Sequence, residues 1–543
     1  MARLGHGEGL VPDSTRERSG EVAPMGARRG LGGRSVRSEA VALIEARRVG
    51  GERSFDFAFP DLRVPEHQLD TGTATLRAIA GLAASMRDVD ASGRSNETPD
   101  GDSAIPAAYT YLGQFIDHDI TLDPQGVGVL EGDDLMPLRA LPRELQNGRS
   151  AQLDLDSVYA APAPFDLSDE RRMRLERVSY RTLSGGPVPG VMPSHVVDDF
   201  HDLPRKPVNR PDPATDREAL IGDGRNDENL IVAQLHVAFL RAHNALAAKA
   251  RSAEAVRRAL RQRYQWLVLN DYLRRICDPD VLQDVLVNGP RHIRMEPNRP
   301  VYMPLEFSAA AYRFGHSMIR ATYDFNDNFG SGGRVVPQPV DFGLMFTFTA
   351  LSGQLGGGGE AGESATLPFN WIIDWSRFAP LAGAVAVQRA RKINTLLTEP
   401  LSRLQHFDGT PHTGLAAMLA QRNLLRGYRL GLPTGQAVAT RLGEAPIAGE
   451  ALLARLPAGQ REAAGPFANK TPLWFYVLAE AGAPRSMGGP DGEHLGRVGS
   501  RIVAETFWNL VRRSKDSILA PGAKLDFNRF ALRDLFTLAD LGG

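Results

Sequence analysis

The sequence lacks several features that would place a protein in a well-defined class. It has one cysteine in 543 residues, so an intramolecular disulfide or a cysteine-based zinc or iron–sulfur site is excluded. No run approaches the roughly 18–20 apolar residues of a membrane span, and the N-terminal region has no apolar stretch typical of a signal peptide. Lys and Arg total 63 against 64 Asp and Glu, which gives no indication of nucleic acid or an anionic membrane as partner.

These absences lead to two expectations. The single cysteine, Cys277, is expected to be a small buried apolar residue. A chain without disulfides or an apolar leader is expected to be cytoplasmic, and unconventional secretion stays open. The oligomeric state is left open as well.

The apolar periodicity that is present is mainly helical. We expect a mainly α-helical fold with very little β-structure: residues 66–543 form one large domain with long loops, and residues 1–65 form a partly disordered N-terminal arm. The aromatics Phe55, Phe57 and Phe59 could lie on the main body. The predicted helices span residues 76–86, 107–120, 227–251, 254–276, 308–320, 385–397, 414–426, 500–513 and 527–538.

The segment LGQFIDHDITLDP, residues 112–124, carries the most informative pattern. On a helix, Gln114 and His118 lie four residues apart and share one face, and Asp117 and Asp119 flank the histidine. Alone, this pattern also fits a surface histidine or one satisfied in the core. The sharper interpretation is acid–base catalysis on a peroxide, which needs a neutral imidazole, a nearby positive charge and, in another segment, a histidine that binds iron.

LGQFIDHDI resembles the distal segment of the animal-type haem peroxidases, the peroxidase–cyclooxygenase superfamily. Four other segments are similar to family segments: RSAQLDLDSVYA (149–160), GDGRNDENLIVAQLHVAFLRAHNALA (222–247), AAYRFGHSMI (310–319) and AQRNLLRGYRLGLPTG (420–435). The resemblance implies a haem peroxidase that binds haem b and reduces hydrogen peroxide, with His118 as its acid–base group.

The resemblance implies a role for each matched residue. Arg225 would be the distal arginine, and Gln114 would hold a water and a halide near the iron. His316 would be the axial ligand of the haem iron, and Arg313 would pair with a haem propionate. Asn423 would accept the other N–H of the proximal imidazole through its side-chain oxygen, which raises the basicity of the ligand.

Two features concern covalent attachment and packing. The family's haem-ester positions are occupied by Asp117 and Glu228, so one or two ester links are expected. Asn229 stands where a methionine would form a sulfonium link, which excludes that link. His236 and His243 lie on the long helix after Arg225 and are interpreted as packing residues.

The 149–160 segment has alternating oxygen-bearing residues, a pattern that suits a hard cation but also fits an acidic surface strand. The resemblance implies a structural calcium ion here. Its ligands would be Asp119, Ser150, Gln152 through its carbonyl, Asp154 and Asp156.

The sequence leaves the electron donor open among phenols, bromide, iodide and thiocyanate. Three alternatives also stay open. A fatty-acid oxygenase of the cyclooxygenase or α-dioxygenase kind would place a tyrosine three residues before His316, where this chain has Arg313, with Tyr312 one residue off. A metal-dependent phosphohydrolase would need further metal ligands around His118 and Asp119. A catalytically inactive binding domain would be expected to lack the distal histidine or arginine.

Overall fold

A computed structural model describes most of the chain. The described residues are 54–123, 145–161, 165–182, 185–206, 218–346, 365–382, 386–404 and 417–542. Residues 1–53 of the predicted N-terminal arm therefore lie outside the described residues.

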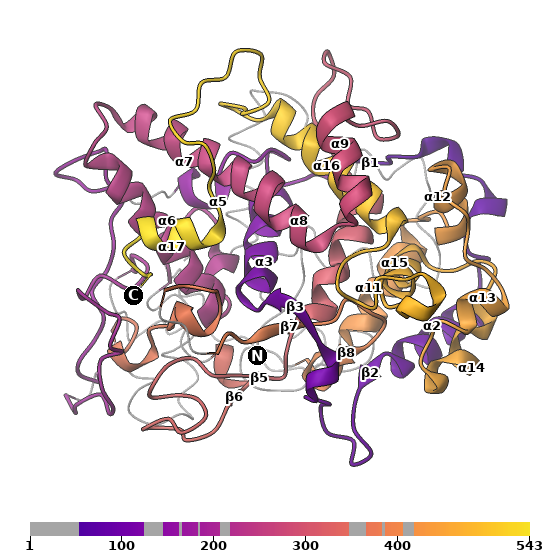
Figure 1. Cartoon of the computed structure of the whole chain (residues 1–543), viewed down its shortest axis with the longest axis horizontal. Coiled ribbons are helices and arrows are strands. Elements are labelled where there is room, and N and C mark those ends of the chain that lie inside the picture. Colours follow the sequence, from indigo (N-terminus) through magenta and orange to yellow (C-terminus); the bar gives the residue numbers. More distant parts are fainter. Residues whose placement is uncertain are drawn as a thin grey trace, which may run out of the picture.

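The architecture is mainly helical, which confirms the predicted fold class (Figure 1). The helices are α2 (Thr73–Ser85), α3 (Ala108–Ile120), α5 (Asp156–Tyr159), α6 (Leu230–Ala247), α7 (Ala253–Leu267), α8 (Leu273–Ile276), α9 (Pro279–Asn288), α10 (Leu305–Ser308), α11 (Leu419–Arg429), α12 (Gly435–Arg441), α13 (Glu450–Leu453), α14 (Arg461–Ala464), α15 (Leu473–Ala481), α16 (Arg497–Arg513) and α17 (Leu532–Leu538).

Strands contribute four short two-stranded sheets within the described residues. They pair β1 (Ser54–Asp56) with β4 (Tyr302–Pro304), β2 (Arg87–Asp88) with β8 (Leu397–Thr398), β3 (Asp102–Pro106) with β7 (Arg389–Arg391), and β5 (Thr322–Tyr323) with β6 (Val340–Asp341).

The helix predicted over residues 385–397 is wrong, because β7 and β8 occupy its described part. The backbone of β7 pairs antiparallel with β3, almost three hundred residues earlier. The Arg391 guanidinium adds hydrogen bonds to the carbonyl oxygens of Thr98 and Asn96, at 2.7 and 2.8 Å. Such long-range pairing decides the backbone conformation of this segment. The apolar periodicity reflects local sequence only and therefore could not predict the pairing.

Several other boundaries differ from the prediction. The helix predicted over residues 308–320 is instead α10 followed by the 3₁₀ helix η9 (Ala311–Met318). The helix predicted from residue 227 begins at Leu230, because the Asn229 side chain accepts the Val232 N–H and caps α6. A π-helical turn, η8 (Val268–Tyr272), interrupts the helix predicted over residues 254–276.

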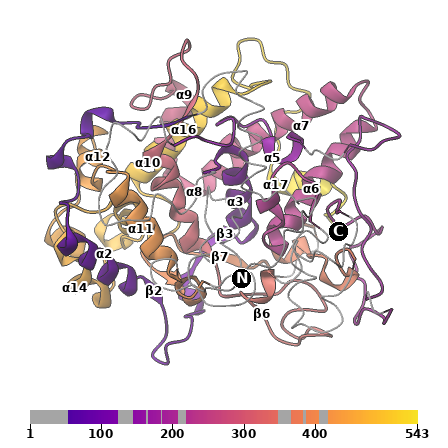
Figure 2. The same ribbon diagram turned by 180° about the vertical axis from the view of Figure 1, so that it is seen from behind.

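Helix α3 lies at the centre of the molecule, with α6, α7 and α17 on one side and α11, α15 and α16 on the other (Figures 1 and 2). Phe115 of α3 stacks on Phe239 of α6, with ring centroids 4.4 Å apart and planes 2° apart. A Cβ at Gly113 would lie 2.6 Å from the Tyr272 hydroxyl oxygen, so glycine there permits the close approach of η8. The core packing therefore fixes the position of α3, which carries His118.

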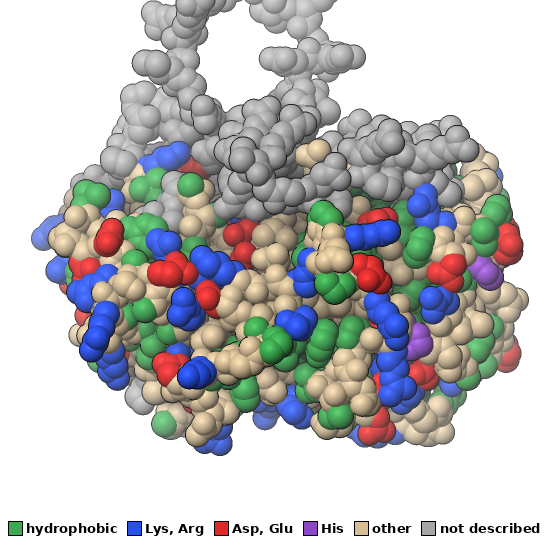
Figure 3. Space-filling view, turned by 90° about the horizontal axis from the view of Figure 1, so that it is seen from above, with side chains coloured by type: hydrophobic (Ala, Val, Ile, Leu, Met, Phe, Trp, Pro, Cys, Tyr) green, Lys and Arg blue, Asp and Glu red, His purple; other side chains and the backbone are tan. Residues whose placement is uncertain are grey.

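Helix α6 is long and apolar enough to cross a bilayer by composition, but 83% of that window is buried inside the protein. It therefore has the properties of a core helix, and it is the single candidate among the described residues. Cys277 is buried, as predicted. On the face shown in Figure 3, basic and acidic side chains are interspersed, in keeping with the net charge of −1.

Residues 54–59 belong to the main body. Phe55, Phe57 and Phe59 are buried in the core. The buried Glu306 carboxylate of α10 accepts the N–H groups of Ala58 and Phe59, at 2.8 and 3.1 Å.

Candidate active site

His118 lies near the end of α3 and is 1% exposed. Its Nδ1 atom is 2.8 Å from the Asn226 side-chain oxygen, which can only accept a hydrogen bond. Burial, reinforced by the charge of Arg225, lowers the pKa of His118 to about 3. The imidazole is therefore neutral at physiological pH, with the proton on Nδ1 and a lone pair on Nε2.

Arg225 lies in the 3₁₀ helix η7 (Gly224–Asp227), and its guanidinium donates hydrogen bonds to two backbone carbonyls and one carboxylate. Its Nη2 atom donates to the carbonyl oxygens of His118 and Thr121, at 3.0 and 2.7 Å. Its Nε and Nη2 atoms also donate to the Asp223 carboxylate, at 3.0 and 2.7 Å. The remaining nitrogen, Nη1, is buried and has no hydrogen-bond partner among the described residues. The structure thus places a fixed positive charge beside His118, with one donor still available.

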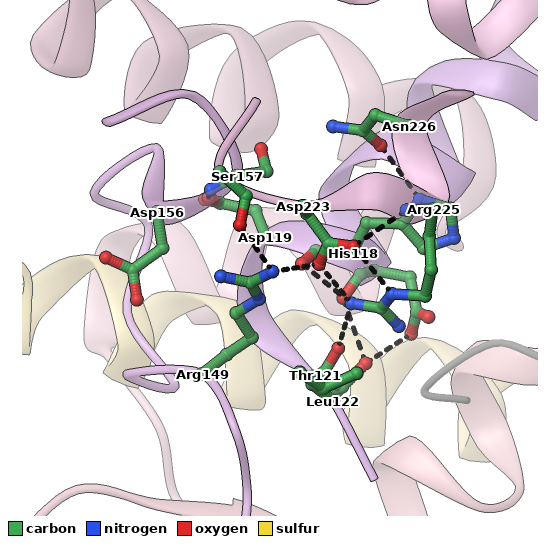
Figure 4. A network of polar contacts seen from close by, with 12 residues as sticks. His118, Asp119, Thr121, Leu122, Arg149, Asp156, Ser157, Asp223, Arg225 and Asn226 are labelled. Carbon is green, nitrogen blue, oxygen red and sulfur yellow. Dashed lines mark hydrogen bonds and ion pairs between the residues drawn. The ribbon is translucent and has the colours of Figure 1, made fainter. Parts of the chain in front are cut away.

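Asp223 joins this site to the loop before α5. Its carboxylate contacts the Arg149 guanidinium as well as that of Arg225 (Figure 4). Burial raises the pKa of Asp223, but the two arginines outweigh burial and hold the pKa well below its ordinary value. A Cβ at Gly222 would lie 2.7 Å from the carbonyl oxygens of Asp156 and Ser157, so only glycine allows this close packing on α5.

The other residues predicted on this side are also buried or half-buried. Asn229 donates to the Gln114 side-chain oxygen at 3.1 Å, one turn of α3 before His118. Asp117 is 1% exposed and accepts a hydrogen bond from the Thr121 hydroxyl at 2.9 Å. Glu228 is 2% exposed.

Asp119 faces away from His118, toward Ser157 and Asp156, whereas His118 lies on the side of Arg225 and Asn226 (Figure 4). The Asp119 carboxylate accepts the N–H groups of Leu155 and Ser157, at 3.2 and 3.0 Å. Burial and the nearby Asp156 raise the pKa of Asp119 to about 7.

The loop before α5 directs further oxygen atoms toward one another. The Ser150 hydroxyl donates to Asp154 at 3.1 Å, and the Ser150 N–H donates to Asp156 at 3.2 Å. Burial, together with the charge of Asp156, raises the pKa of Asp154 well above its ordinary value. Gln152 is half-buried in the same loop, and its neighbour Ala151 has a left-handed backbone with φ of 52°. Within the described residues, no three His, Cys, Asp or Glu side chains form a ready-made metal site.

His316 lies in η9 and is 2% exposed. Its Nδ1 atom is 2.7 Å from the Asn423 side-chain nitrogen of α11. This amide orientation is opposite to the predicted one, because Arg313 donates to the Asn423 oxygen at 3.3 Å and so turns the nitrogen toward the imidazole. The predicted acceptor role of Asn423 requires the amide to turn by 180°.

Three buried arginines lie on the two elements that carry His316 and Asn423. Burial lowers the pKa of Arg313, Arg422 and Arg426 to about 10 each. Glu228 partly offsets this effect at Arg422, which places these two side chains near each other. The electrostatics of this region favour an added anionic group.

Arg313 and Arg426 line a small cavity together with Thr121 and Leu305. The cavity therefore lies between the residue that ends α3 and the segments around η9. Its volume is about 30 Å³, against roughly 300–1,000 Å³ for typical ligand pockets. His118, Arg225 and His316 are not among its lining residues, so this cavity is not itself a haem-sized pocket between the two histidines.

The sequence did not single out Asn226, Asp223, Arg422 or Arg426. His236, interpreted as a packing residue, is fully buried and packs edge-on to Phe115, and its Nδ1 atom also lies 3.0 Å from the Asn226 side-chain nitrogen. Arg422 directly precedes Asn423 on α11 and Arg426 follows it three residues later, and this spacing of cations was the available signal.

The animal haem peroxidase family model matches residues 130–434 of this chain. That range contains Arg225, His316 and Asn423 but begins after His118. The chain is 32% identical to human thyroid peroxidase over 205 residues, which are 33% of this chain and 20% of that protein. It is 25% identical to peroxinectin A of Dictyostelium discoideum over 282 residues, 50% of this chain and 46% of that protein. The chain thus spans less than half the length of these relatives.

Two solved structures share the fold. Peroxidase A from Dictyostelium discoideum superimposes with a TM-score of 0.56 at 16% identity, over 86% of this chain and 89% of that chain. The fatty acid α-dioxygenase of Oryza sativa superimposes with a TM-score of 0.52 at 14% identity, over 86% and 79%. At these identities the likeness concerns the fold alone.

Proposed function

This chain belongs to the animal haem peroxidase family, and on that premise we propose that it binds haem b, reduces hydrogen peroxide and oxidises small electron donors. The donors would be phenols or halides such as bromide, iodide or thiocyanate. The observation that supports this most is the buried, neutral His118 with its proton on Nδ1 and the fixed charge of Arg225 beside it.

The distal residues would move one proton and stabilise one charge. His118 Nε2 accepts a proton from one oxygen of hydrogen peroxide and returns it to the other oxygen, which leaves as water. Arg225 Nη1, which has no other hydrogen-bond partner among the described residues, stabilises the negative charge on that leaving oxygen. Gln114 would hold the distal water and a halide.

The proximal residues would hold the cofactor. His316 would ligate the iron, with Asn423 as the hydrogen-bond partner of its Nδ1 atom. Arg313 would pair with a propionate, and Arg422 and Arg426 would add positive charge there. Bound haem supplies the redox-active iron that takes up the oxidising equivalents of the peroxide.

Covalent attachment and calcium belong to the same proposal. The buried carboxyls of Asp117 and Glu228 would form one or two ester links to the haem. A calcium ion would be held by the side chains of Asp119, Ser150, Asp154 and Asp156 and the carbonyl of Gln152. The raised pKa values of Asp119 and Asp154 support this, because a cation removes the mutual repulsion of the carboxylates.

The rival activity is fatty-acid oxygenation. It receives little support from the region before His316, where Arg313 occupies the position that an oxygenase gives to its tyrosine. The Tyr312 hydroxyl is engaged elsewhere: it donates to the Gly113 carbonyl oxygen and lies 3.2 Å from the Tyr272 hydroxyl.

Steady-state assays of the haem-loaded protein distinguish the two activities. We expect peroxide-dependent oxidation of guaiacol and iodide, and no oxygen uptake with palmitate or linoleate in the absence of peroxide. Oxygen uptake without peroxide activity would contradict the proposal. Acid–organic extraction tests the ester links: fully extractable, unmodified haem would exclude them.

A further inference from the structure

A chain of three buried polar side chains runs from the distal histidine into the core. His118 Nδ1 lies 2.8 Å from Asn226 Oδ1, and Asn226 Nδ2 lies 3.0 Å from His236 Nδ1. The exposed fractions are 1% for His118 and 0% for Asn226 and His236. Figure 4 shows the Asn226 amide beside His118, on the side opposite to Asp119.

The three residues come from three elements that pack against one another. His118 belongs to α3, Asn226 to η7 and His236 to α6. The His236 ring lies edge-on to Phe115, which itself stacks on Phe239. The positions of both imidazoles are therefore set by core packing rather than by the hydrogen bonds alone.

The Asn226 amide determines which nitrogen of each imidazole carries the proton. Its oxygen can only accept, so His118 must donate from Nδ1 and keep its lone pair on Nε2. Its nitrogen can only donate, so His236 must accept at Nδ1.

Turning the amide by 180° would reverse both assignments. His118 would then carry its proton on Nε2 and could no longer accept one there. After His118 takes a proton at Nε2, moreover, its Nδ1–H still needs an acceptor, and the Asn226 oxygen serves in both protonation states. One amide orientation therefore suits the whole proton transfer. In that orientation His236 accepts at Nδ1 and carries its proton on Nε2, which has no hydrogen-bond partner among the described residues.

We infer that Asn226 and His236 are positioning residues for His118: Asn226 holds the imidazole in the tautomer that leaves Nε2 able to accept a proton, and His236 holds the Asn226 amide in the required orientation. This inference rests on the proposed function of His118. His236 thus does not contact His118 itself and acts on it through the Asn226 side chain.

A purely structural role for the pair predicts a different experimental result. If the chain only filled the core, substitutions would disturb the whole distal pocket and slow every ligand that enters it. If it sets the tautomer, substitutions should slow only those ligands that deliver a proton to His118. Hydrogen cyanide delivers such a proton when it binds ferric haem, whereas carbon monoxide binds ferrous haem without one.

The test is stopped-flow association of cyanide and of carbon monoxide with the haem-loaded variants. Asn226→Leu should slow cyanide by about 10- to 100-fold and His236→Leu by about 10-fold, with carbon monoxide nearly unchanged. Asn226→Asp keeps an acceptor for His118 Nδ1 and should recover part of the cyanide rate. His243→Leu is the matched control on the same helix, because His243 bonds to Tyr159 and Arg171 instead, and it should change neither rate.

An unchanged cyanide rate in Asn226→Leu would overturn the inference, and so would equal losses for both ligands. If the wild-type chain took up no haem, the proposed function would fail separately. The tautomer is then read from the imidazole resonances of protein labelled with ¹⁵N-histidine. A His118 proton on Nδ1 that shifts toward Nε2 in Asn226→Leu supports the inference, and the same tautomer in both proteins contradicts it.

Discussion

The distal and proximal sides of the proposed haem site differ in how their charges are compensated. On the distal side, Arg225 is bound to Asp223 and two backbone carbonyls, and His118 is bound to Asn226. On the proximal side, burial lowers the pKa values of Arg313, Arg422 and Arg426. Arg225 is thus held by a carboxylate, whereas Arg313 donates to the Ser308 carbonyl oxygen and the Asn423 amide oxygen, at 2.9 and 3.3 Å, which are neutral acceptors.

This difference separates two tasks. Proton transfer needs groups held in place before the reaction, because a shift of the base or the charge lowers the rate. Cofactor binding can instead use buried positive charge, which the propionates would neutralise. Substitutions on the two sides should therefore give distinct results: lost rate on the distal side and lost haem on the proximal side.

Substitution of His316 should have the largest effect on haem binding. His316→Ala removes the proposed iron ligand and should lower haem affinity by at least about 100-fold. Haem titration followed by the Soret absorbance measures this. His243→Ala is the control, since it removes a buried histidine of α6. Full haem retention in His316→Ala would contradict the assignment of the proximal side.

Arg422→Met should lower haem affinity by about 10-fold, because the proposed propionates lose a buried positive charge. It should also destabilise the protein without haem, because the nearby Glu228 loses an opposite charge. Haem titration and calorimetry measure the two effects. Arg241→Met is the control: Arg241 is also buried and is paired with Asp198 at 2.9 Å, so its loss should destabilise the protein without changing haem affinity. Unchanged haem affinity in Arg422→Met would contradict a role for Arg422 in haem binding.

Calcium removal should affect the distal side more than the proximal side. At a hundredfold excess over its Kd, a bound ion stabilises the folded state by about 2.7 kcal/mol. Chelation with EGTA should therefore lower the melting temperature and slow the peroxide reaction, while haem content stays unchanged. Asp154→Asn should abolish the response to EGTA, and Asp526→Asn, on the exposed surface, should preserve it. A wild-type protein indifferent to EGTA would argue against a calcium ion in this loop.

The effect furthest from the catalytic groups concerns Glu306, in α10 before the proximal segment. Burial raises its pKa from an ordinary 4.5 to about 7. The protonated form is thus favoured in the folded state, so this contribution to stability is complete below about pH 4.5 and is lost as the pH rises through about 7. Glu306→Gln should reduce this loss of folding free energy between about pH 4.5 and 7 by about 1–3 kcal/mol. Urea unfolding at several pH values measures it, with the exposed Glu462→Gln as control; parallel slopes for Glu306→Gln and wild type would contradict the assignment.

The sequence predicted the helical fold and the central helix α3 closely, because the apolar period of α3 is set by residues local in sequence. It failed at β7 and at η9, where pairing and packing with distant segments decide the backbone. The motifs named His118 and Arg225 from their family pattern. They could not reveal Asn226 and His236, because hydrogen bonds between side chains of different elements leave no periodic signal in the sequence.

The orientation of Asn423 illustrates a second limit. Its position on α11 beside His316 agrees with the family pattern, but the direction of its amide depends on Arg313. Arg313 in turn would be drawn away by a propionate. The hydrogen bond between Asn423 and His316 would therefore change when haem binds. The hydrogen bond between Asn226 and His118 involves protein atoms only.

The central claim is that His118 transfers the proton of the peroxide while His316 and its neighbours hold the haem. Stopped-flow absorbance of haem-loaded His118→Ala with hydrogen peroxide tests it most directly. Haem content should equal that of the wild type, and the Soret shift should slow by about 10²- to 10⁴-fold. A shift at the wild-type rate, or loss of haem from the variant, would contradict it.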